Sequence, residues 1–339
     1  MIKLQSVLND SFRLLTCLSF KKLSNIIQLG FSYVTRRFTD HPFQHGLPYA
    51  LSVEVSTFCN LHCTECPSGL RKFTRPTGLI NHDFFKQIID QVKGHLVYLT
   101  LYFQGEPYLH PQFLSLVRYA HDNGIYTATS TNGHFLTKEN AQETIVSGLD
   151  RVIVSLDGLD QETYSKYRVS GNVEKVKNGL KNLVEAKKEN HSKTPYIILQ
   201  FIAFAHNQHQ IEAVKAYGKE LGVDEVQIKS AQIYDFDKGS NLLIDDIKYT
   251  RYERLEDGGW QIRSKLPDRC WRMWSACVIT WDGMIVPCCF DKDADHRLGN
   301  LNDDTFKQIW KSKAYKQFRD KVFINRKQIE ICRNCSEGL

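Results

Sequence analysis

The sequence predicts an α/β protein: a partial (β/α)6 barrel of the TIM type, followed by a small cysteine-rich module made of a β-hairpin and a helix. Three observations support this fold class. Six short runs rich in β-branched and aromatic residues alternate with helical patterns over residues 50–230. Unusual motifs directly follow the expected strands. Cysteines cluster again after the strand and helix alternation has ended.

The expected barrel strands are short, and helices are expected between them. Apolar residues recur three and four positions apart within 84–92, 113–119, 173–184 and 211–221, which is the spacing of an amphipathic helix. Strands joined by helical connections run parallel with right-handed crossovers, and six such units can curve into a partial barrel. The expected strands are Leu51–Ser56, Val97–Phe103, Ile125–Ser130, Arg151–Leu156, Tyr196–Phe204 and Glu225–Lys229.

Each of the first four expected strands is followed by a motif that carries chemistry. In chain order these are Cys59-Asn60-Leu61-His62-Cys63-Thr64-Glu65-Cys66, Gln104-Gly105-Glu106-Pro107, Thr131-Asn132-Gly133 and Asp157-Gly158. The carboxyl ends of parallel barrel strands meet on one rim, where the functional residues of such barrels lie. We therefore expect all four motifs to meet at that rim.

The cysteine motif places three thiols within eight residues, separated by three and then two positions. Three thiolates on one loop can ligate an iron-sulfur cube and leave its fourth iron without a protein ligand. Soft thiolates also suit zinc or copper(I), so the spacing alone does not decide the metal. A tetrahedral structural zinc needs a fourth ligand, and none lies nearby in the sequence.

Composition sets wider bounds. The 339 residues are 42% hydrophobic and 24% charged, which is typical of a globular protein with a large domain and a smaller one. The ten cysteines fall in clusters and no secretory leader precedes them, so we expect a cytoplasmic protein. No run of 18 apolar residues occurs, and the motifs of P-loop, dinucleotide-binding, serine-hydrolase and zincin sites are missing from the sequence.

Residues 1–49 are expected to form a basic, amphipathic helical extension. Residues 1–40 hold six basic and two acidic side chains, and so account for +4 of the net charge of +6. The nearly neutral remainder argues against nucleic-acid binding. The extension is expected to pack on the main domain, or to make peripheral contact with an anionic membrane surface or a partner through residues 1–40.

The barrel is expected over residues 50–232, a linker with one helix over 233–265, and a cysteine-rich module over 266–339. In the module, Val278–Val286 reads as a β-hairpin with an Asp-Gly turn, and a helix is expected through Phe306, Ile309, Trp310, Ala314 and Phe318. The cysteines of the module are Cys270, Cys277, Cys288, Cys289, Cys332 and Cys335.

At Cys59, Cys63 and Cys66 the sequence resembles the radical SAM superfamily, and the resemblance extends from about Ala50 to Lys229. It implies that these three cysteines hold a [4Fe-4S] cluster with S-adenosylmethionine on the open iron. Gly105, Glu106 and Pro107 resemble the family's G-G-E-P turn, whose backbone receives the methionine amino group. Gln104 replaces the first glycine of that turn, and Glu65 stands where the family commonly has an aromatic residue near the adenine.

The resemblance also implies further contacts with the cofactor. Ser155 and Asp157 correspond to a polar pair that contacts the ribose, and Arg168 to an arginine that meets the cofactor carboxylate. Asn132 and Gln200 are weaker candidates for cofactor contact. Read without the resemblance, Ser155 and Asp157 could also cap a helix, and Arg168 could lie on the surface.

The C-terminal cysteines resemble the SPASM/twitch module, with twelve residues from Cys270 to Gly283 and four from Gly283 to Cys288. The resemblance implies one auxiliary [4Fe-4S] cluster, and the expected ligands are Cys270, Cys288, Cys332 and Cys335, with Cys277 as the alternate. A structural zinc ion would also suit four thiolates.

The expected function is therefore a radical SAM enzyme that forms a 5′-deoxyadenosyl radical and abstracts hydrogen from a peptide, a protein or a small metabolite. Its other expected partner is an electron donor such as flavodoxin or ferredoxin. The alternative is a cysteine-rich zinc scaffold without catalysis. The substrate and the catalytic hydrogen or proton donor are not predicted.

Overall fold

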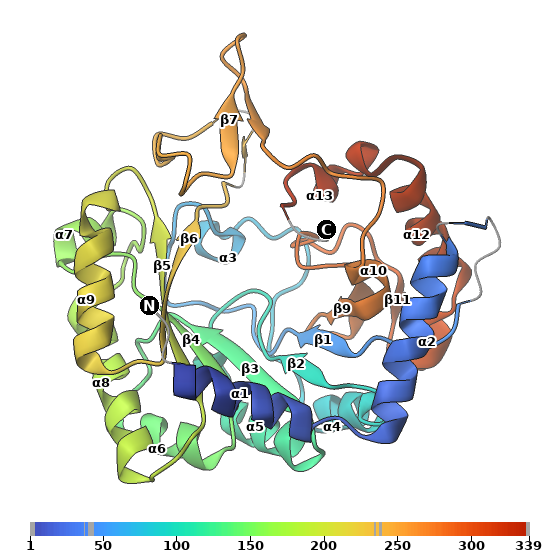
Figure 1. Cartoon of the computed structure of the whole chain (residues 1–339), viewed down its shortest axis with the longest axis horizontal. Coiled ribbons are helices and arrows are strands. Elements are labelled where there is room, and N and C mark those ends of the chain that lie inside the picture. Colours follow the sequence, from blue (N-terminus) through green and yellow to red (C-terminus); the bar gives the residue numbers. More distant parts are fainter. Residues whose placement is uncertain (1–3, 37, 40–43, 234, 237–238, 337–339) are drawn as a thin grey trace.

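The computed structural model describes residues 4–36, 38–39, 44–233, 235–236 and 239–336. Figure 1 shows a curved sheet with helices along its outer side, and the C-terminal module beside the first strand. Residues 1–3, 37 and 40–43 of the N-terminal extension, and 337–339 of the cysteine-rich module, lie outside the described residues.

Six parallel strands form the barrel wall, as the sequence predicts. They are β1 (Ala50–Val53), β2 (Tyr98–Thr100), β3 (Tyr126–Thr131), β4 (Arg151–Ser155), β5 (Tyr196–Ala203) and β6 (Glu225–Ser230). Each strand pairs in parallel with the next one in the sequence, from β1 to β6. The α/β fold class and the strand order are therefore confirmed, although β1 and β2 are shorter than expected.

Helices follow the strands, and several of them begin at a side-chain cap. The Asn81 side chain accepts from the amides of Asp83 and Phe84 at the start of α4, and Asn172 caps α8 in the same way. The mostly polar α6 was not expected from the sequence, because it lacks a regular apolar stripe. The helices of the barrel are α3 (Pro67–Leu70), α4 (His82–Val92), α5 (Phe113–Asp122), α6 (Lys138–Val146), α7 (Gln161–Ser165), α8 (Val173–Glu189) and α9 (Ile211–Leu221), with short 3-10 turns η1 (Pro107–Leu109) and η2 (Gln208–Gln210).

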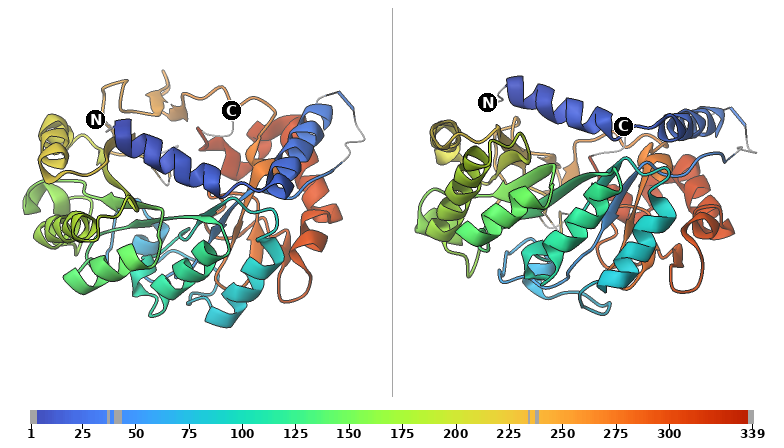
Figure 2. Two further views of the ribbon diagram at one scale, coloured as in Figure 1. Left: turned by 60° about the horizontal axis from the view of Figure 1, so that its bottom comes forward. Right: turned by 90° about the horizontal axis from the view of Figure 1, so that it is seen from below.

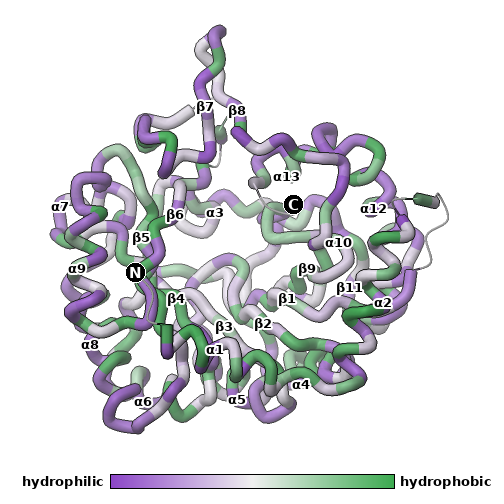
Figure 3. The backbone as a smooth tube through the Cα atoms, in the orientation of Figure 1, coloured by the Kyte–Doolittle hydropathy of each residue, from purple (hydrophilic) through white to green (hydrophobic). Residues whose placement is uncertain are grey.

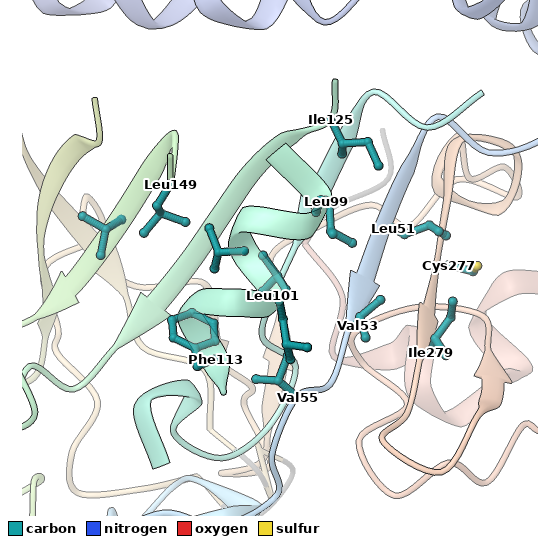
Figure 4. Packing of buried hydrophobic residues seen from close by; sticks show 14 of the residues in the cluster. Leu51, Val53, Val55, Leu99, Leu101, Phe113, Ile125, Leu149, Cys277 and Ile279 are labelled. Carbon is teal, nitrogen blue, oxygen red and sulfur yellow. The ribbon is translucent and has the colours of Figure 1, made fainter. Parts of the chain in front are cut away.

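The main core lies between the outer face of the sheet and these helices. Figure 4 shows Leu51 and Val53 of β1 near Leu99 of β2 and Ile279 of the C-terminal module. All four side chains are at most 2% exposed. Burying a side chain of this size contributes about 1.5–3 kcal/mol, so this layer makes a large part of the stability of the fold.

The C-terminal hairpin is confirmed, and it also extends the barrel sheet. It consists of β9 (Ala276–Ile279) and β10 (Met284–Val286), with Gly283 at a φ of +89° in the turn. β9 pairs in parallel with β1, and β11 (Gly299–Asn300) pairs with β10, so the sheet has the order β11-β10-β9-β1-β2-β3-β4-β5-β6. The sequence did not predict this junction, because its strand partners lie more than 200 residues apart.

The helix expected after the hairpin is divided in two. α11 (Phe306–Trp310) ends before Ser312, whose side chain accepts from the amide of Tyr315 and so begins α12 (Lys313–Asn325). The module also contains α10 (Arg272–Ser275), the 3-10 turn η4 (Arg326–Gln328) and α13 (Glu330–Arg333).

Residues 233–265 were expected to form a linker with one helix. In the part of this segment that the structure describes there is no α-helix, so that prediction is wrong there. The segment instead contains an antiparallel hairpin of β7 (Tyr252–Arg254) and β8 (Trp260–Ile262), which projects at the top of Figure 1. Ile233, Leu243 and Tyr252 are buried against Leu61 and Cys63 of the first cysteine loop. The segment thus packs on the barrel mouth, because its scattered apolar residues converge there.

The N-terminal extension forms α1 (Leu4–Thr16) and α2 (Phe20–Arg36), which lie on one side of the molecule in Figure 2. Polar contacts hold α1 against the amino ends of the strands. Ser6 Oγ donates to Asp224 at 2.7 Å, Arg13 Nε pairs with Asp150 at 2.6 Å, and Asp10 accepts from Tyr126 and Arg151. Within the described residues, no helix is long and apolar enough to cross a bilayer.

Candidate functional site

The first cysteine loop leaves the carboxyl end of β1 and folds tightly on itself. The amide of Cys66 donates to the carbonyl of Cys63 at 3.3 Å, and a Cβ added at Gly69 would lie 2.5 Å from the Cys63 nitrogen. All three thiols are free. Cys63 is buried, whereas Cys59 and Cys66 are half-buried.

Nitrogen donors surround two of these thiols. The Leu61 amide donates to Cys59 Sγ at 3.4 Å, and Asn132 Nδ2 lies 3.9 Å from the same sulfur. Arg168 Nη1 lies 3.9 Å from Cys63 Sγ. Burial raises the pKa of Cys59 to about 11 and also raises the pKa of Cys63. Each thiol therefore loses its proton readily only when a bound metal replaces that proton on the sulfur. Thiols with N–H donors fit the ligands of an iron-sulfur cluster, whose sulfurs accept such bonds.

The expected Gly105-Glu106-Pro107 turn presses against this loop. Gly105 has a φ of +73°, and a Cβ there would lie 2.4 Å from the carbonyl oxygen of Ser56, so only glycine fits. The Glu106 amide donates to the carbonyl of Phe58 at 2.7 Å, one residue before Cys59. At the substituted position, Gln104 is buried and accepts from Ser68 Oγ at 3.4 Å, while Ser68 Oγ accepts from the Gly105 amide.

The Glu106 side chain is buried and connects the turn to the end of β3. Its carboxylate accepts from Thr131 Oγ1 at 2.8 Å, from the Asn132 amide at 2.8 Å and from the Tyr108 amide at 3.2 Å. Burial raises its pKa to about 7, and these donors oppose that rise. The side chain therefore positions Asn132, whose own amide group donates to Asn60 within the cysteine loop at 2.7 Å.

Asp157 and Arg168 meet at the end of β4. Arg168 Nε donates to Asp157 Oδ2 at 2.6 Å, and the amide of Ile202 donates to Asp157 Oδ1 at 2.6 Å. Asp157 is fully buried, so its carboxylate fixes the direction of the arginine toward Cys63. Ser155 and Gln200 are paired across β4 and β5, which places both side chains on one face of the sheet.

Four C-terminal cysteines also come together. Burial raises the pKa of Cys288, and the neighbouring thiols of Cys289, Cys332 and Cys335 raise it further. Burial likewise raises the pKa of Cys332, with a smaller contribution from Cys270. Cys270, Cys332 and Cys335 are all less than 10% exposed, and the chain supplies them from the loop before α10, from α13 and from the residues after it.

Cys277, the alternate ligand, lies in a different environment. It is on β9 in the main core, in the layer that Figure 4 shows with Leu51 and Ile279. Burial raises its pKa to about 12, and a hydrogen bond with Tyr315 and the charge of Arg319 oppose that rise. The structure thus brings Cys270, Cys288, Cys332 and Cys335 together and places Cys277 among packing residues.

Arg326 is a site residue that the sequence did not reveal. Its guanidinium is buried, and Nη2 lies 3.3 Å from Cys335 Sγ while Nη1 donates to the carbonyl of Arg269 at 3.1 Å. A buried cation beside several thiols fits an anionic cluster there. In the sequence this residue looks like any other basic side chain, so no signal distinguished it.

No three His, Cys, Asp or Glu side chains within the part of the chain that the structure describes converge closely enough to hold one metal ion. A structural zinc would need each of its thiolate sulfurs about 2.3 Å from the metal.

A polar cavity lies between the residues that follow β6 and the C-terminal module. The cavity has a volume of about 190 Å³. Lys292 lies on its wall; burial lowers the pKa of this lysine, and the nearby thiols of Cys66 and Cys289 oppose the shift. The lining residues are Gln232, Asp235, Phe236, Phe290, Lys292, Asp293, Asp295, Glu330, Ile331, Arg333 and Asn334.

A parallel barrel with a three-cysteine loop at its mouth and a second thiol set beside it defines a class of iron-sulfur enzymes. Residues 53–202 match the radical SAM superfamily, and residues 270–336 match the SPASM family, described as an iron-sulfur cluster-binding domain. The chain belongs to the radical SAM superfamily and is an enzyme of this family with a SPASM domain.

Relatives and solved structures agree with this assignment. The chain is 26% identical over 318 residues to the tungsten-containing aldehyde ferredoxin oxidoreductase cofactor-modifying protein of Pyrococcus furiosus, which covers 84% of this chain and 86% of that protein. Its fold is similar to that of BtrN in complex with AdoMet and 2-DOIA, with a TM-score of 0.56, 20% identity, and coverage of 87% and 95%. It is also similar to Streptococcus suis SuiB bound to precursor peptide SuiA, with a TM-score of 0.63, 14% identity, and coverage of 87% and 72%.

Proposed function

We propose that this enzyme cleaves S-adenosylmethionine reductively at a [4Fe-4S] cluster held by Cys59, Cys63 and Cys66, and abstracts hydrogen from a substrate at the barrel mouth. The proposal rests on the residues that meet at one rim of the barrel. There, three free thiols on one loop meet N–H donors from the loops after other strands. When bound, the cluster and S-adenosylmethionine supply a 5′-deoxyadenosyl radical.

The residues of the rim bind and orient the cofactor in this proposal. The backbone of Gly105, Glu106 and Pro107 receives the methionine amino group, because the turn lies directly against the cysteine loop. Arg168 meets the cofactor carboxylate, and Asp157 holds its guanidinium in place. Ser155 at the end of β4, Asn132 after β3 and Gln200 within β5 supply polar contacts.

The proposed auxiliary [4Fe-4S] cluster is held by Cys270, Cys288, Cys332 and Cys335. Their mutual proximity and the buried Arg326 support this choice. Cys277 lies on β9 beside Tyr315 and Arg319, and this different environment argues against the alternate ligand. A cluster with four protein ligands has no open iron, so we assign it to electron transfer. A one-electron donor such as flavodoxin or ferredoxin would supply the first cluster.

The substrate is proposed to be polar. Charged side chains of both signs line the cavity at the mouth, among them Lys292, Asp293 and Arg333. BtrN is described with 2-DOIA and SuiB with a precursor peptide, so this fold accommodates ligands of very different size. A peptide or a polar metabolite therefore fits the mouth of this protein.

Replacing Cys63 by Ala tests the proposal. We expect anaerobically purified wild-type protein to be brown, with broad absorption near about 400 nm, and to release 5′-deoxyadenosine when reduced in the presence of S-adenosylmethionine. The Cys63→Ala variant should lose this release to background and should lose the iron of one cluster. Iron content and product are measured by colorimetric assay and chromatography.

Cys277→Ala is the matched control, because it removes a buried thiol that we place in the core. It should keep the iron content and the 5′-deoxyadenosine release of the wild type. Retained release in Cys63→Ala would refute the site assignment. A colourless wild-type protein that contains zinc would instead favour the non-catalytic scaffold.

A further inference from the structure

Large apolar side chains on α1 and α2 face solvent. Ten of the sixteen exposed large hydrophobic residues in the described part of the chain lie within residues 4–38. We define the N-terminal apolar face as nine of these on the two helices: Leu4, Leu8, Phe12, Leu15, Phe20, Leu23, Ile27, Phe31 and Val34. Phe20 is 89% exposed and Leu4 is 74% exposed, so this concentration of apolar surface needs an explanation.

The face follows the helical repeat. Leu4, Leu8 and Phe12 are spaced by four residues, and Ile27, Phe31 and Val34 by four and three, which puts each set on one side of its helix. In Figure 3, hydrophobic and hydrophilic residues alternate along both helices. A surface helix ordinarily buries its apolar stripe.

These helices contact the body through inward-facing apolar side chains, such as the fully buried Leu29, and through polar contacts, and they leave a second apolar set outside. Lys22 is buried and donates to the carbonyl of Gly124 at 2.7 Å, and Ser32 Oγ donates to the carbonyl of His45 at 2.9 Å. Together with the contacts of Ser6, Asp10 and Arg13 described above, they fix both helices in this orientation. The apolar face is therefore held outward by the fold itself.

We propose that the N-terminal apolar face docks on the surface of an anionic lipid bilayer. Residues 1–40 carry a formal charge of +4. Among residues 4–36, the single carboxylate is Asp10, which is buried and bonded to Arg151 and Tyr126, so it does not oppose anionic headgroups. Of the basic side chains in the same range, Arg13 pairs with Asp150, Arg36 pairs with Asp320 and Lys22 is buried, so Lys21 supplies the exposed positive charge. Apolar side chains beside this lysine match a bilayer surface, which has negative headgroups above an apolar layer.

The size of the helices also fits this occupant. α1 has 13 residues and α2 has 17, which is short for crossing a bilayer but suits helices that lie in its plane. Figure 2 shows both helices on the same side of the barrel, where one flat surface can meet them together. A second copy of this chain would bring two basic segments together, which the charge disfavours.

This docking mode sets the direction of the active site. α1 contacts Asp150 and Asp224, which precede β4 and β6, whereas the cysteine loop follows β1. The face thus lies toward the amino ends of the strands, and the proposed catalytic mouth lies at their carboxyl ends. A bound enzyme would open toward water and take its substrate from there. The docking itself does not depend on the proposed chemistry.

Vesicle sedimentation of the full chain tests the proposal. We expect wild-type protein to sediment with vesicles of equal parts phosphatidylglycerol and phosphatidylcholine, and much less with pure phosphatidylcholine vesicles. The Phe12→Gln/Phe31→Gln variant should partition at least tenfold more weakly, because it removes two apolar side chains from the face. The matched control is Val146→Gln/Ile324→Gln, which removes two exposed apolar side chains elsewhere and should bind like wild type.

Thermal unfolding, and 5′-deoxyadenosine release without vesicles, should be the same in all these proteins. Equal sedimentation of the wild type and Phe12→Gln/Phe31→Gln would overturn the proposal, as would a wild type that binds neither vesicle. A wild-type dimer that forms without lipid and dissociates in the double variant would assign the face to a second copy. Equal binding to both vesicle compositions would reject the role of charge.

Discussion

Two arginines direct a guanidinium nitrogen at a cysteine sulfur. Arg168 Nη1 lies 3.9 Å from Cys63 Sγ, and Arg326 Nη2 lies 3.3 Å from Cys335 Sγ. The first is also held by Asp157, so part of its charge is compensated. Arg326 donates instead to the carbonyl of Arg269, and the neighbouring thiols of Cys270, Cys332 and Cys335 favour its charged form. Arg326 is therefore the stronger candidate for tuning a cluster.

We predict that Arg326→Gln lowers the midpoint potential of the auxiliary cluster. The reduced cluster carries one more negative charge than the oxidised one, so a nearby cation stabilises it. A hydrogen bond to a charged group contributes about 1.5–3 kcal/mol, which corresponds to about 65–130 mV for a one-electron couple. A redox titration followed by electron paramagnetic resonance measures the shift. Arg326→Lys keeps the charge and should recover most of the potential; an unchanged midpoint in Arg326→Gln would remove this role.

Individual site residues were predictable only where spacing or a motif marked them. Cys59, Cys63 and Cys66 are recognisable because three thiols must be close in sequence to share a loop. From the sequence, the Asp157 carboxylate was expected to contact a ligand. In the structure its two oxygens accept hydrogen bonds from Arg168 and from the Ile202 amide. Arg326 becomes distinctive only when the chain brings it to Cys335, and no local pattern encodes that meeting.

At the scale of elements, a buried ion pair ties the segment after the cysteine loop to the barrel. Arg75 Nη1 and Nη2 contact the two oxygens of Glu54 at 2.8 and 2.6 Å, and both side chains are at most 2% exposed. The amide of Trp281 donates to the same carboxylate, and Arg75 Nε donates to the carbonyl of Lys292. The pair thus joins β1, the loop that leads to α4, and the C-terminal module.

We predict that Arg75→Met destabilises the protein by about 3–5 kcal/mol near pH 8, because it leaves the Glu54 carboxylate buried without a counter-ion. Burial raises the pKa of Glu54 even with Arg75 present. A raised carboxyl pKa costs stability as pH increases, so the loss should be smaller near pH 5, where Glu54 can be protonated. Thermal unfolding followed by circular dichroism at both pH values measures it.

The double variant Glu54→Gln/Arg75→Met is the control for the ion pair. It removes the buried charge together with its partner, so it should be more stable than Arg75→Met alone at high pH. Equal unfolding temperatures for Arg75→Met and the wild type at both pH values would show that the pair has no net stabilising effect.

Elements with strong periodicity were the predictable ones. The β5 run from Tyr196 to Ala203 is almost continuously apolar, and α4 repeats apolar residues at helical spacing, so both were expected from local sequence. The polar α6 gave no such pattern and forms because tertiary packing covers its few apolar residues. Residues 233–265 are mostly polar, so the sequence did not mark Tyr252 as a packing residue. In the structure its hydroxyl donates to Asn334 and so joins the segment to the C-terminal cysteines.

At the scale of the whole molecule, the barrel and the SPASM domain share one sheet and one core. β9 pairs with β1 along Ala50–Val53, and Ile279 packs in the same cluster as Leu51 and Val53. Trp274, Phe306 and Trp310 of the C-terminal module belong to this cluster as well. We therefore expect that the two family matches, at 53–202 and 270–336, do not correspond to two independent folding units.

We predict that a chain of residues 1–266 does not fold cooperatively. Its β1 would become an open edge, and the apolar residues beneath β9 would meet water. Several buried side chains at about 1.5–3 kcal/mol each equal the whole stability of a typical domain, about 5–15 kcal/mol. Soluble yield and thermal unfolding measure the effect.

The full chain with Cys335→Ala separates loss of the core from loss of the auxiliary cluster. This variant removes a proposed ligand but keeps β9 and the packing around Trp274, so it should lose iron and still unfold in one cooperative transition. A soluble 1–266 chain with a cooperative transition and wild-type release of 5′-deoxyadenosine would show that the barrel folds alone. In that case the shared sheet would be a docking contact between two stable domains, and the auxiliary cluster could be removed without affecting the first one.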